Sequence, residues 1–237
     1  MTRAALVAAL AVAGCAEAPD AVVFTAASAA DVAEDAAGRV RADGASVAVS
    51  VGATSTLARQ VAAGAPADVF VAADGAWIDW LVDEGVDVRD RAVLARGRLV
   101  VVARDRGPAA TLREALGGAG RIALGDPAHV PAGVYARDAL RRAGLWEAVA
   151  GRVVPQADAR AALAAVETGA AEAAVVYASD ARASRRVGVV YRIEAGAAPP
   201  VQYEAALVGA GAGRDVFDAL ADPDLWARHG FEPVGGP

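Results

Sequence analysis

The stretch AVVFTAASAADVAEDAAGRVRADGASVAVSVGATSTLARQVAAGAPADVFVAAD, residues 21–74, decides the fold class. It contains three short apolar strands, at 21–26, 46–52 and 67–73, and a segment with helical spacing of apolar residues follows each of them. Strands that alternate with helices at such short intervals are typical of parallel sheets covered by helices. The stretch therefore predicts an α/β fold.

The same alternation continues towards the end of the chain. Further strands are predicted at 97–104, 121–126, 151–156, 171–179, 188–194 and 201–210, and further helices at 111–117, 132–143, 158–169, 213–221 and 224–229. Two such blocks predict two lobes around a cleft, each a mostly parallel sheet flanked by helices. Lobe 1 is expected to contain residues 21–98 and 204–237, and lobe 2 residues 99–203. Two crossings between the lobes would form a hinge that permits closure around a ligand.

The N-terminal segment has the features of a bacterial export signal. Residues 1–14 combine Arg3 with a short apolar run and small residues before Cys15, and the run is too short to span a bilayer. The ending VAGC resembles a lipobox, in which the cysteine carries a lipid, and residues 15–20 then form a tether. The alternative is a buried thiol after an ordinary signal peptide. We expect an exported protein, anchored by lipid at the outer face of the cell membrane or in the periplasm.

Uncharged hydrogen-bond donors follow the strands at the predicted cleft, where open α/β sheets bind ligands. These donors are the hydroxyls of Ser28, Thr54, Ser55 and Tyr177 and the backbone amides at the predicted helix starts, Ala132 and Ala159. The first N–H groups of a helix have no partner within it, and the helix dipole adds about half a positive charge there. Such a set can bind an anion without any cation. Pro127 and Pro131 would fix the loop that aims the Ala132 amide.

Several longer motifs make the chain recognisable at these residues. They are AAS (26–28), STLARQVAAGAPADVFVAAD (55–74), LVVVAR (99–104), GDPAHVPAGVYARDAL (125–140) and VVYASDA (176–182). With them the chain resembles the substrate-binding proteins of bacterial molybdate ABC transporters, which have the type II periplasmic-binding fold. The resemblance implies that the oxyanion is held by Ser28, by Thr54 or Ser55, by the amides of Ala132 and Ala159, and by Tyr177. Thr54 stands where serine is expected, and Ala159 where many relatives have a larger apolar residue.

The resemblance implies a binding protein that captures molybdate, and tungstate too, and delivers it to a membrane permease. It implies no catalytic residue, no cofactor, no direct cation ligand for a metal, and a monomer. A pocket of donors alone suits a dianion that carries no proton, whereas hydrogen phosphate needs an acceptor. Sulfate is the alternative ligand, although it is smaller. The formal net charge of −6 gives no reason to expect nucleic acid as a partner.

Other interpretations stay open from the residues alone. Ser28 with Asp31 matches a capping box, Thr54 and Ser55 could also cap a helix, and Tyr177 could only pack between the lobes. A secreted hydrolase would use Ser28 or Ser55 with His129 and Asp126, although the chain has no G-x-S-x-G elbow. The effector domain of a transcription factor is a third reading. The export signal and the lack of a helix-turn-helix segment argue against it.

Overall fold

The computed structural model describes residues 18–194, 196–198 and 200–234. The expected signal peptide, residues 1–14, lies outside the described residues, and so does Cys15. In the part of the chain that is described, none of the helices combines the length and the apolar character needed to cross a bilayer.

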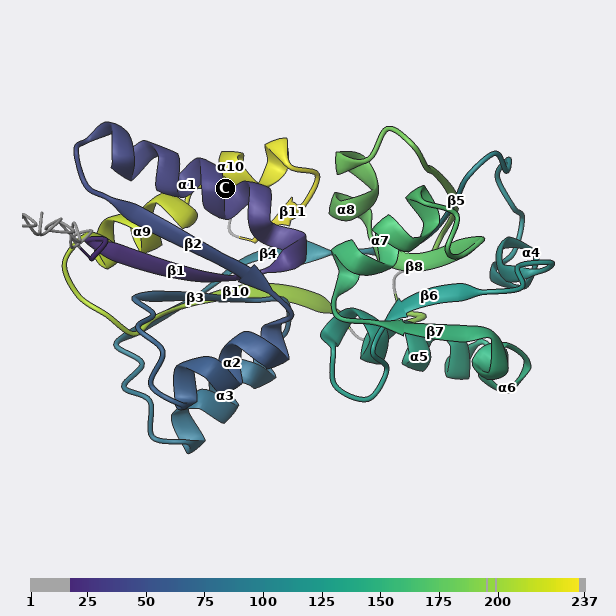
Figure 1. Cartoon of the computed structure of the whole chain (residues 1–237), viewed down its shortest axis with the longest axis horizontal. Coiled ribbons are helices and arrows are strands. Elements are labelled where there is room, and N and C mark those ends of the chain that lie inside the picture. The colour runs from purple at the N-terminus through teal and green to yellow at the C-terminus, as the bar shows by residue number, and fades with distance from the viewer. Residues whose placement is uncertain (1–17, 195, 199, 235–237) are drawn as a thin grey trace, which may run out of the picture.

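Lobe 1 is built on a six-stranded sheet with the order β11-β4-β10-β3-β1-β2 (Figure 1). Its strands are β1 (Ala21–Ala26), β2 (Val47–Gly52), β3 (Val69–Ala72), β4 (Asp90–Gly97), β10 (Val201–Leu207) and β11 (Glu232–Pro233). β1 runs parallel to β2 and β3, whereas β10 runs antiparallel to β3 and β4. β10 pairs within this sheet from Val201 onwards.

Lobe 2 is built on a five-stranded sheet with the order β7-β6-β8-β5-β9. Its strands are β5 (Leu99–Ala103), β6 (Ile122–Gly125), β7 (Val153–Gln156), β8 (Ala173–Tyr177) and β9 (Gly188–Arg192). β6 runs parallel to β7 and β8, whereas β5 runs antiparallel to β8 and β9.

Both sheets are therefore mixed, and the expectation of mostly parallel sheets was wrong. The reason lies in the two crossings between the lobes. The chain passes from β4 directly into β5 and returns from β9 to β10, with no helix in either connection. These two connections run in opposite directions between the lobes. They bring antiparallel strands side by side, because a parallel pair would need a longer crossover. β4 was not predicted as a strand at all, since Asp90, Arg91 and Arg96 interrupt its apolar residues.

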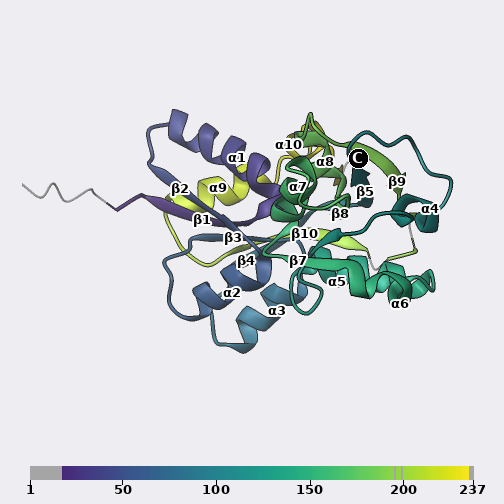
Figure 2. The same ribbon diagram turned by 45° about the vertical axis from the view of Figure 1, so that its right-hand side comes forward.

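Helices cover both faces of each sheet, as the two views in Figures 1 and 2 show. In lobe 1, α1 (Ala30–Ala42), α9 (Ala212–Leu220) and α10 (Pro223–Arg228) lie on one face, and α2 (Thr54–Ala62) and α3 (Ala76–Asp83) on the other. In lobe 2, α7 (Ala159–Glu167) and α8 (Ala178–Ala183) lie opposite α5 (Pro131–Arg142) and α6 (Trp146–Val149), and α4 (Leu112–Leu116) lies at the far end. Short 3₁₀ turns, η1 (Ala27–Ala29) and η2 (Ala150–Arg152), complete the described elements.

A cluster of aromatic side chains packs where the lobes join. The Tyr203 ring on β10 lies 5.8 Å from the Tyr177 ring on β8, 5.6 Å from Trp226 and 4.8 Å from Phe231, measured between centroids. Trp226 is fully buried and donates its indole N–H to the Leu220 carbonyl at 2.8 Å. Most other core residues are alanine and valine, so this cluster supplies the largest buried side chains at the boundary between the lobes.

Candidate functional site

A small pocket lies between the lobes, at the carboxyl ends of strands from both sheets. Lobe 1 contributes Ala26, Ala27, Ser28, Gly52, Ala53, Thr54 and Ala73, and lobe 2 contributes Val130, Pro131, Ala132, Asp158, Ala159 and Tyr177. These residues follow β1, β2 and β3 in lobe 1 and β6, β7 and β8 in lobe 2. The structure therefore gathers at one place five of the six predicted site residues, from loops far apart in the sequence.

Ser28 lies in η1, directly after β1, and is 4% exposed. Its hydroxyl caps no helix, because α1 begins at Ala30 without a side-chain cap. The helix-cap interpretation of Ser28 was therefore wrong. Instead, the Ser28 hydroxyl accepts a hydrogen bond from the Tyr203 hydroxyl at 2.7 Å. The single proton of Ser28 is thus free to donate into the pocket.

Thr54 is the first residue of α2 and lines the pocket, whereas Ser55 is not among the lining residues. The Thr54 hydroxyl accepts a hydrogen bond from the Ala73 amide at 3.2 Å, which leaves its proton free to donate. The Ser55 hydroxyl is buried and has no hydrogen-bond partner in the described structure. Neither hydroxyl caps α2, so the cap interpretation was wrong here too.

Tyr177 ends β8 and reaches the pocket from lobe 2. It is 2% exposed, and its hydroxyl has no hydrogen-bond partner among the described residues. Burial raises the pKa of Tyr177 well above its usual value, so the phenol keeps its proton. A buried donor without an acceptor costs free energy unless a ligand or water accepts from it. The side chain does pack between the lobes, but packing alone leaves its hydroxyl unexplained.

Two helices of lobe 2 start at the pocket. α5 has Pro131 as its first residue and α7 begins at Ala159, so the amides of Ala132 and Ala159 lie in first turns, where the helix offers no acceptor. Gly133 is required at the start of α5, because a Cβ there would lie 1.8 Å from the Gly125 carbonyl oxygen. Close packing of α5 on β6 thus fixes the direction of the Ala132 amide.

Charge at the pocket is limited to one carboxylate. Among the described residues that line it there is no lysine or arginine, and Asp158 is the one acidic residue. Asp158 caps α7 and accepts from the Ala161 amide at 2.8 Å. No carboxylate was expected at the site from the sequence, and Asp158 was not singled out, although its place just before a helix marks it as a cap.

An arginine lies beside the pocket without lining it. Arg160 bonds Asp180 of α8 and Asp31 of α1 at 2.8 Å each, so two carboxylates neutralise it. Burial raises the pKa of Asp180 to about 6, although Arg160 opposes this shift. Because Asp31 belongs to lobe 1 and Arg160 to lobe 2, their ion pair spans the two lobes.

The hydrolase constellation is not assembled. His129 Nδ1 lies 3.9 Å from Asp126 Oδ2, both side chains are about 40% exposed, and neither residue lines the pocket with Ser28. In the described part of the chain, no group of three or more histidine, cysteine, aspartate or glutamate side chains is placed to hold a metal ion. The residues that line the pocket can donate hydrogen bonds to an anion, and neither His129 nor Asp126 is among them.

Tyr203 is the participant that the sequence analysis missed. No local pattern distinguishes it from a core tyrosine, and its partner Ser28 lies 175 residues away in the chain. Only the return of β10 into the first sheet brings the two hydroxyls together.

Comparisons of the sequence and of the structure with known proteins find relatives of the same kind. Residues 21–223 match the profile of the bacterial extracellular solute-binding protein family. Molybdate-binding protein ModA of Escherichia coli is 38% identical over 228 residues, which cover 88% of this chain and 87% of that protein. The solved periplasmic molybdate-binding protein of Azotobacter vinelandii is similar with a TM-score of 0.78 at 23% identity, covering 89% of this chain and 98% of that one.

The same fold also occurs with another anion. The sulfate-binding protein SubI of Mycobacterium tuberculosis is similar with a TM-score of 0.73 at 17% identity, and the match covers 90% of this chain and 86% of that chain. The fold therefore does not by itself select between oxyanions.

Proposed function

The chain belongs to the bacterial extracellular solute-binding proteins, in the group that includes the molybdate-binding proteins ModA, and on that basis we propose that it captures molybdate for an ABC importer. The observation that carries the proposal is a pocket between two lobes whose donors are all uncharged. The buried, unpartnered hydroxyl of Tyr177 is the clearest sign that a ligand acceptor belongs there.

We propose that the oxyanion is bound by the Ser28, Thr54 and Tyr177 hydroxyls and by two helix amides, those of Ala132 and Ala159. Thr54 is favoured over Ser55 because Thr54 lines the pocket and its proton is free. Each helix end contributes about 0.3–1 kcal/mol when exposed and up to about 2 when partly buried. Hydrogen bonds to a charged acceptor are roughly twice as strong as neutral ones. Together these terms can offset the dehydration of a dianion without a cation.

Selection among oxyanions would follow from the donors. Molybdate and tungstate carry no proton at neutral pH and accept from every donor, whereas hydrogen phosphate must also donate. Sulfate has the same charge as molybdate but is smaller, so donors spaced for the larger anion would not all reach it. Asp158 is the one acceptor in the lining that could take a phosphate proton.

A panel of anions tests the proposal. The purified protein is titrated with molybdate, tungstate, sulfate, phosphate and chromate, and the unfolding midpoint is measured at each concentration. Stabilisation follows RT ln(1 + [L]/Kd), which is about 4 kcal/mol when the ligand is a thousandfold above Kd. We expect molybdate and tungstate to stabilise strongly and phosphate much less. A phosphate response equal to that of molybdate would contradict the proposal. If that phosphate response disappeared in Asp158→Asn, Asp158 would be identified as the acceptor of the phosphate proton.

The family implies an exported protein. We further propose that it acts as a monomer, that Cys15 anchors it by lipid, and that a membrane permease receives the anion from it. The support for the anchor is the lipobox-like VAGC with the chain's one cysteine at its end. Fatty-acid labelling that Cys15→Ser abolishes would support the anchor, and labelling that persists would exclude it.

A further inference from the structure

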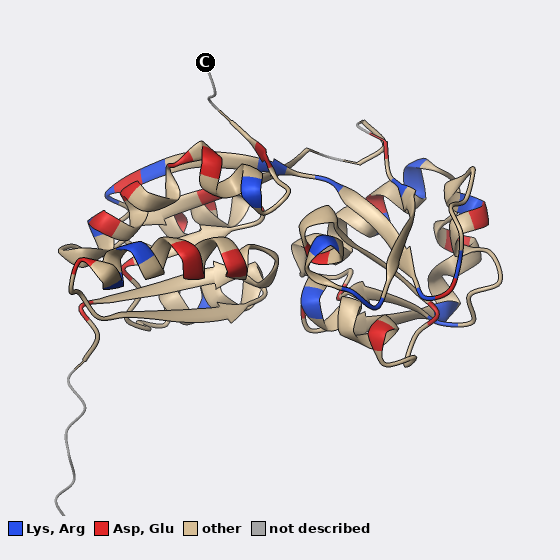
Figure 3. Cartoon of the chain, turned by 90° about the horizontal axis from the view of Figure 1, so that it is seen from above, with Lys and Arg blue, Asp and Glu red and all other residues tan. Residues whose placement is uncertain are grey.

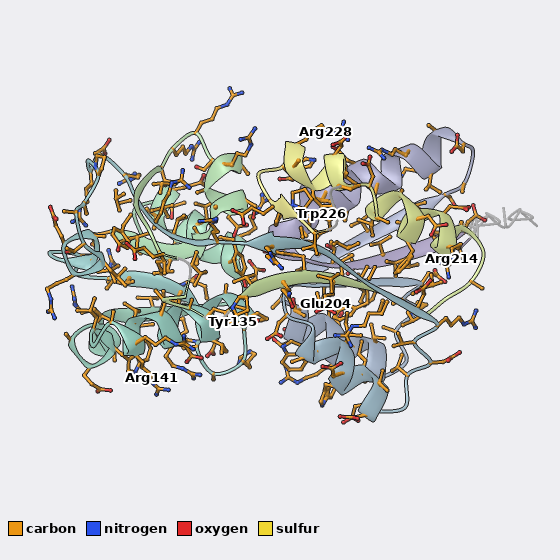
Figure 4. All side chains as sticks on the ribbon, turned by 180° about the vertical axis from the view of Figure 1, so that it is seen from behind. Tyr135, Arg141, Glu204, Arg214, Trp226 and Arg228 are labelled. Atoms are coloured by element: carbon orange, nitrogen blue, oxygen red, sulfur yellow. The ribbon has the colours of Figure 1, made fainter. Side chains whose placement is uncertain are left out.

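Tyr203 is a fully buried residue of β10 that lies just behind the pocket. It precedes Glu204, and its ring packs on Trp226; both of these neighbours are labelled in Figure 4. Tyr203 is not among the residues that line the pocket. Its hydroxyl nevertheless reaches Ser28, which does line the pocket, at 2.7 Å.

The hydrogen bond runs from the Tyr203 phenol to the Ser28 hydroxyl. The Tyr203 phenol has one proton, and Ser28 Oγ is its acceptor within the described structure. If Ser28 donated to Tyr203 instead, the buried phenol would have to turn its proton from Ser28 to the neighbouring Ser179 hydroxyl, which makes no hydrogen bond in the described structure. Burial raises the pKa of Tyr203 well above its usual value, against a smaller opposite effect of the Ser28 and Ser179 hydroxyls. The phenol therefore stays protonated and stays a donor.

Thr54, which lobe 1 also contributes to the pocket, shows the same arrangement. Its hydroxyl accepts from the Ala73 amide at 3.2 Å, a group that can only donate. In both residues an internal donor takes one lone pair of the hydroxyl oxygen and leaves the proton for the ligand. An unconstrained hydroxyl, in contrast, can rotate to donate or to accept.

We propose that Tyr203 is a positioning residue that sets ligand specificity: by donating to Ser28 Oγ, it directs the Ser28 proton to the bound anion. This proposal rests on the proposed function, because it concerns how the same site rejects oxyanions that carry a proton. A ligand such as hydrogen phosphate presents an O–H, for which Ser28 Oγ has only one lone pair left once it accepts from Tyr203. Without the phenol, Ser28 can turn and accept it.

The test compares Tyr203→Phe with the wild type by calorimetric titration with molybdate and with phosphate at neutral pH. Phenylalanine keeps the ring that packs on Tyr177, Trp226 and Phe231. We expect molybdate affinity to fall about tenfold while phosphate affinity is unchanged or higher. The ratio of the phosphate dissociation constant to the molybdate dissociation constant should therefore decrease. Tyr191→Phe is the matched control, since Tyr191 lies on β9 away from the pocket, and should leave both affinities unchanged.

A double-mutant cycle shows whether Tyr203 acts through Ser28. In a Ser28→Ala background the Tyr203→Phe change should have no further effect on molybdate affinity. Equal loss of affinity for both anions, or an effect of Tyr203→Phe that persists in Ser28→Ala, would overturn the proposal. If the wild type itself fails to prefer molybdate, the proposed function fails instead, so the two failures are distinguishable.

Neutron diffraction from wild-type crystals with molybdate gives a readout that needs no variant. We expect the Tyr203 deuteron to point at Ser28 Oγ and the Ser28 deuteron to point at the anion. A Ser28 deuteron directed at Tyr203 would contradict the proposal, even if Tyr203→Phe did not fold.

Discussion

The hydroxyl of Tyr177 is buried without a partner, so its replacement separates ligand binding from stability. Tyr177→Phe removes one hydrogen bond to a charged acceptor, and we expect binding of molybdate to weaken by roughly 1.5–3 kcal/mol. Unfolding without ligand should occur at an equal or higher temperature, because no internal hydrogen bond is lost. Calorimetric titration and thermal unfolding measure the two effects. Unchanged affinity would remove Tyr177 from the site.

Thr54 and Ser55 can be distinguished in the same way. Thr54→Val keeps the shape but removes the proton, and should weaken binding by roughly 1.5–3 kcal/mol, whereas Thr54→Ser should retain it. Ser55→Ala is the matched control, because the Ser55 hydroxyl has no partner and does not line the pocket. A loss of affinity in Ser55→Ala with none in Thr54→Val would assign the role to Ser55.

At the scale of single residues, the sequence was informative about donors and uninformative about what orients them. Ser28, Thr54 and Tyr177 follow strand ends that a sheet brings to one edge, so their convergence was predictable. The Tyr203–Ser28 hydrogen bond was not, because it depends on the register of β10 in a sheet made by distant segments. Asp158 was overlooked because the site was expected to hold neutral groups alone.

The start of α5 is the element on which the Ala132 amide depends. A Cβ at Gly133 would lie 1.8 Å from the Gly125 carbonyl oxygen, and a backbone atom cannot turn aside as a side chain can. We expect Gly133→Ala to lower the unfolding midpoint and to weaken molybdate binding, since α5 must move away from β6. Circular dichroism melts and titration measure both.

Gly38 in α1 provides the control for that substitution. It is exposed, and a Cβ there would meet nothing within 4 Å. Gly38→Ala should therefore stabilise the protein by roughly 0.5–1 kcal/mol, as alanine does in a helix interior, and leave binding unchanged. A Gly133→Ala protein that binds and unfolds like the wild type would show that the tight packing of α5 on β6 is not needed.

At the scale of elements, the helices and most strands were predictable from apolar periodicity, because each buries one face against a sheet. The mixed character of the sheets was not. In lobe 1 it results from β4 and β10, which pair with each other over Asp90–Gly97 and Val201–Leu207, and in lobe 2 it results from β5, which runs antiparallel to β8 and β9. Pairing between strands about a hundred residues apart leaves no local signal in a stretch such as β4, where charged residues flank a short apolar run.

The ion pair between Arg160 and Asp31 links the two lobes beside the pocket. Figure 3 marks the positions of acidic residues (red) and of arginines (blue) along the ribbon, and both occur on each lobe. Asp31→Asn removes the pair but keeps the buried Arg160–Asp180 contact. We expect molybdate affinity to fall by about 0.2–1 kcal/mol, as for other partly exposed pairs, and the unliganded protein to become more open by small-angle X-ray scattering.

Asp35→Asn is the matched control on the same helix. Asp35 pairs with His229, and both residues belong to lobe 1, so its loss should not affect closure. If Asp31→Asn and Asp35→Asn changed affinity and scattering equally, the pair with Arg160 would have no role in holding the lobes together.

The central claim is that uncharged donors between two lobes suffice to hold a dianion, and a crystal structure with molybdate tests it most directly. We predict the anion in the pocket, in contact with the hydroxyls of Ser28, Thr54 and Tyr177 and with the amides of Ala132 and Ala159. An anion bound by an arginine side chain, or found outside the gap between the lobes, would contradict the account.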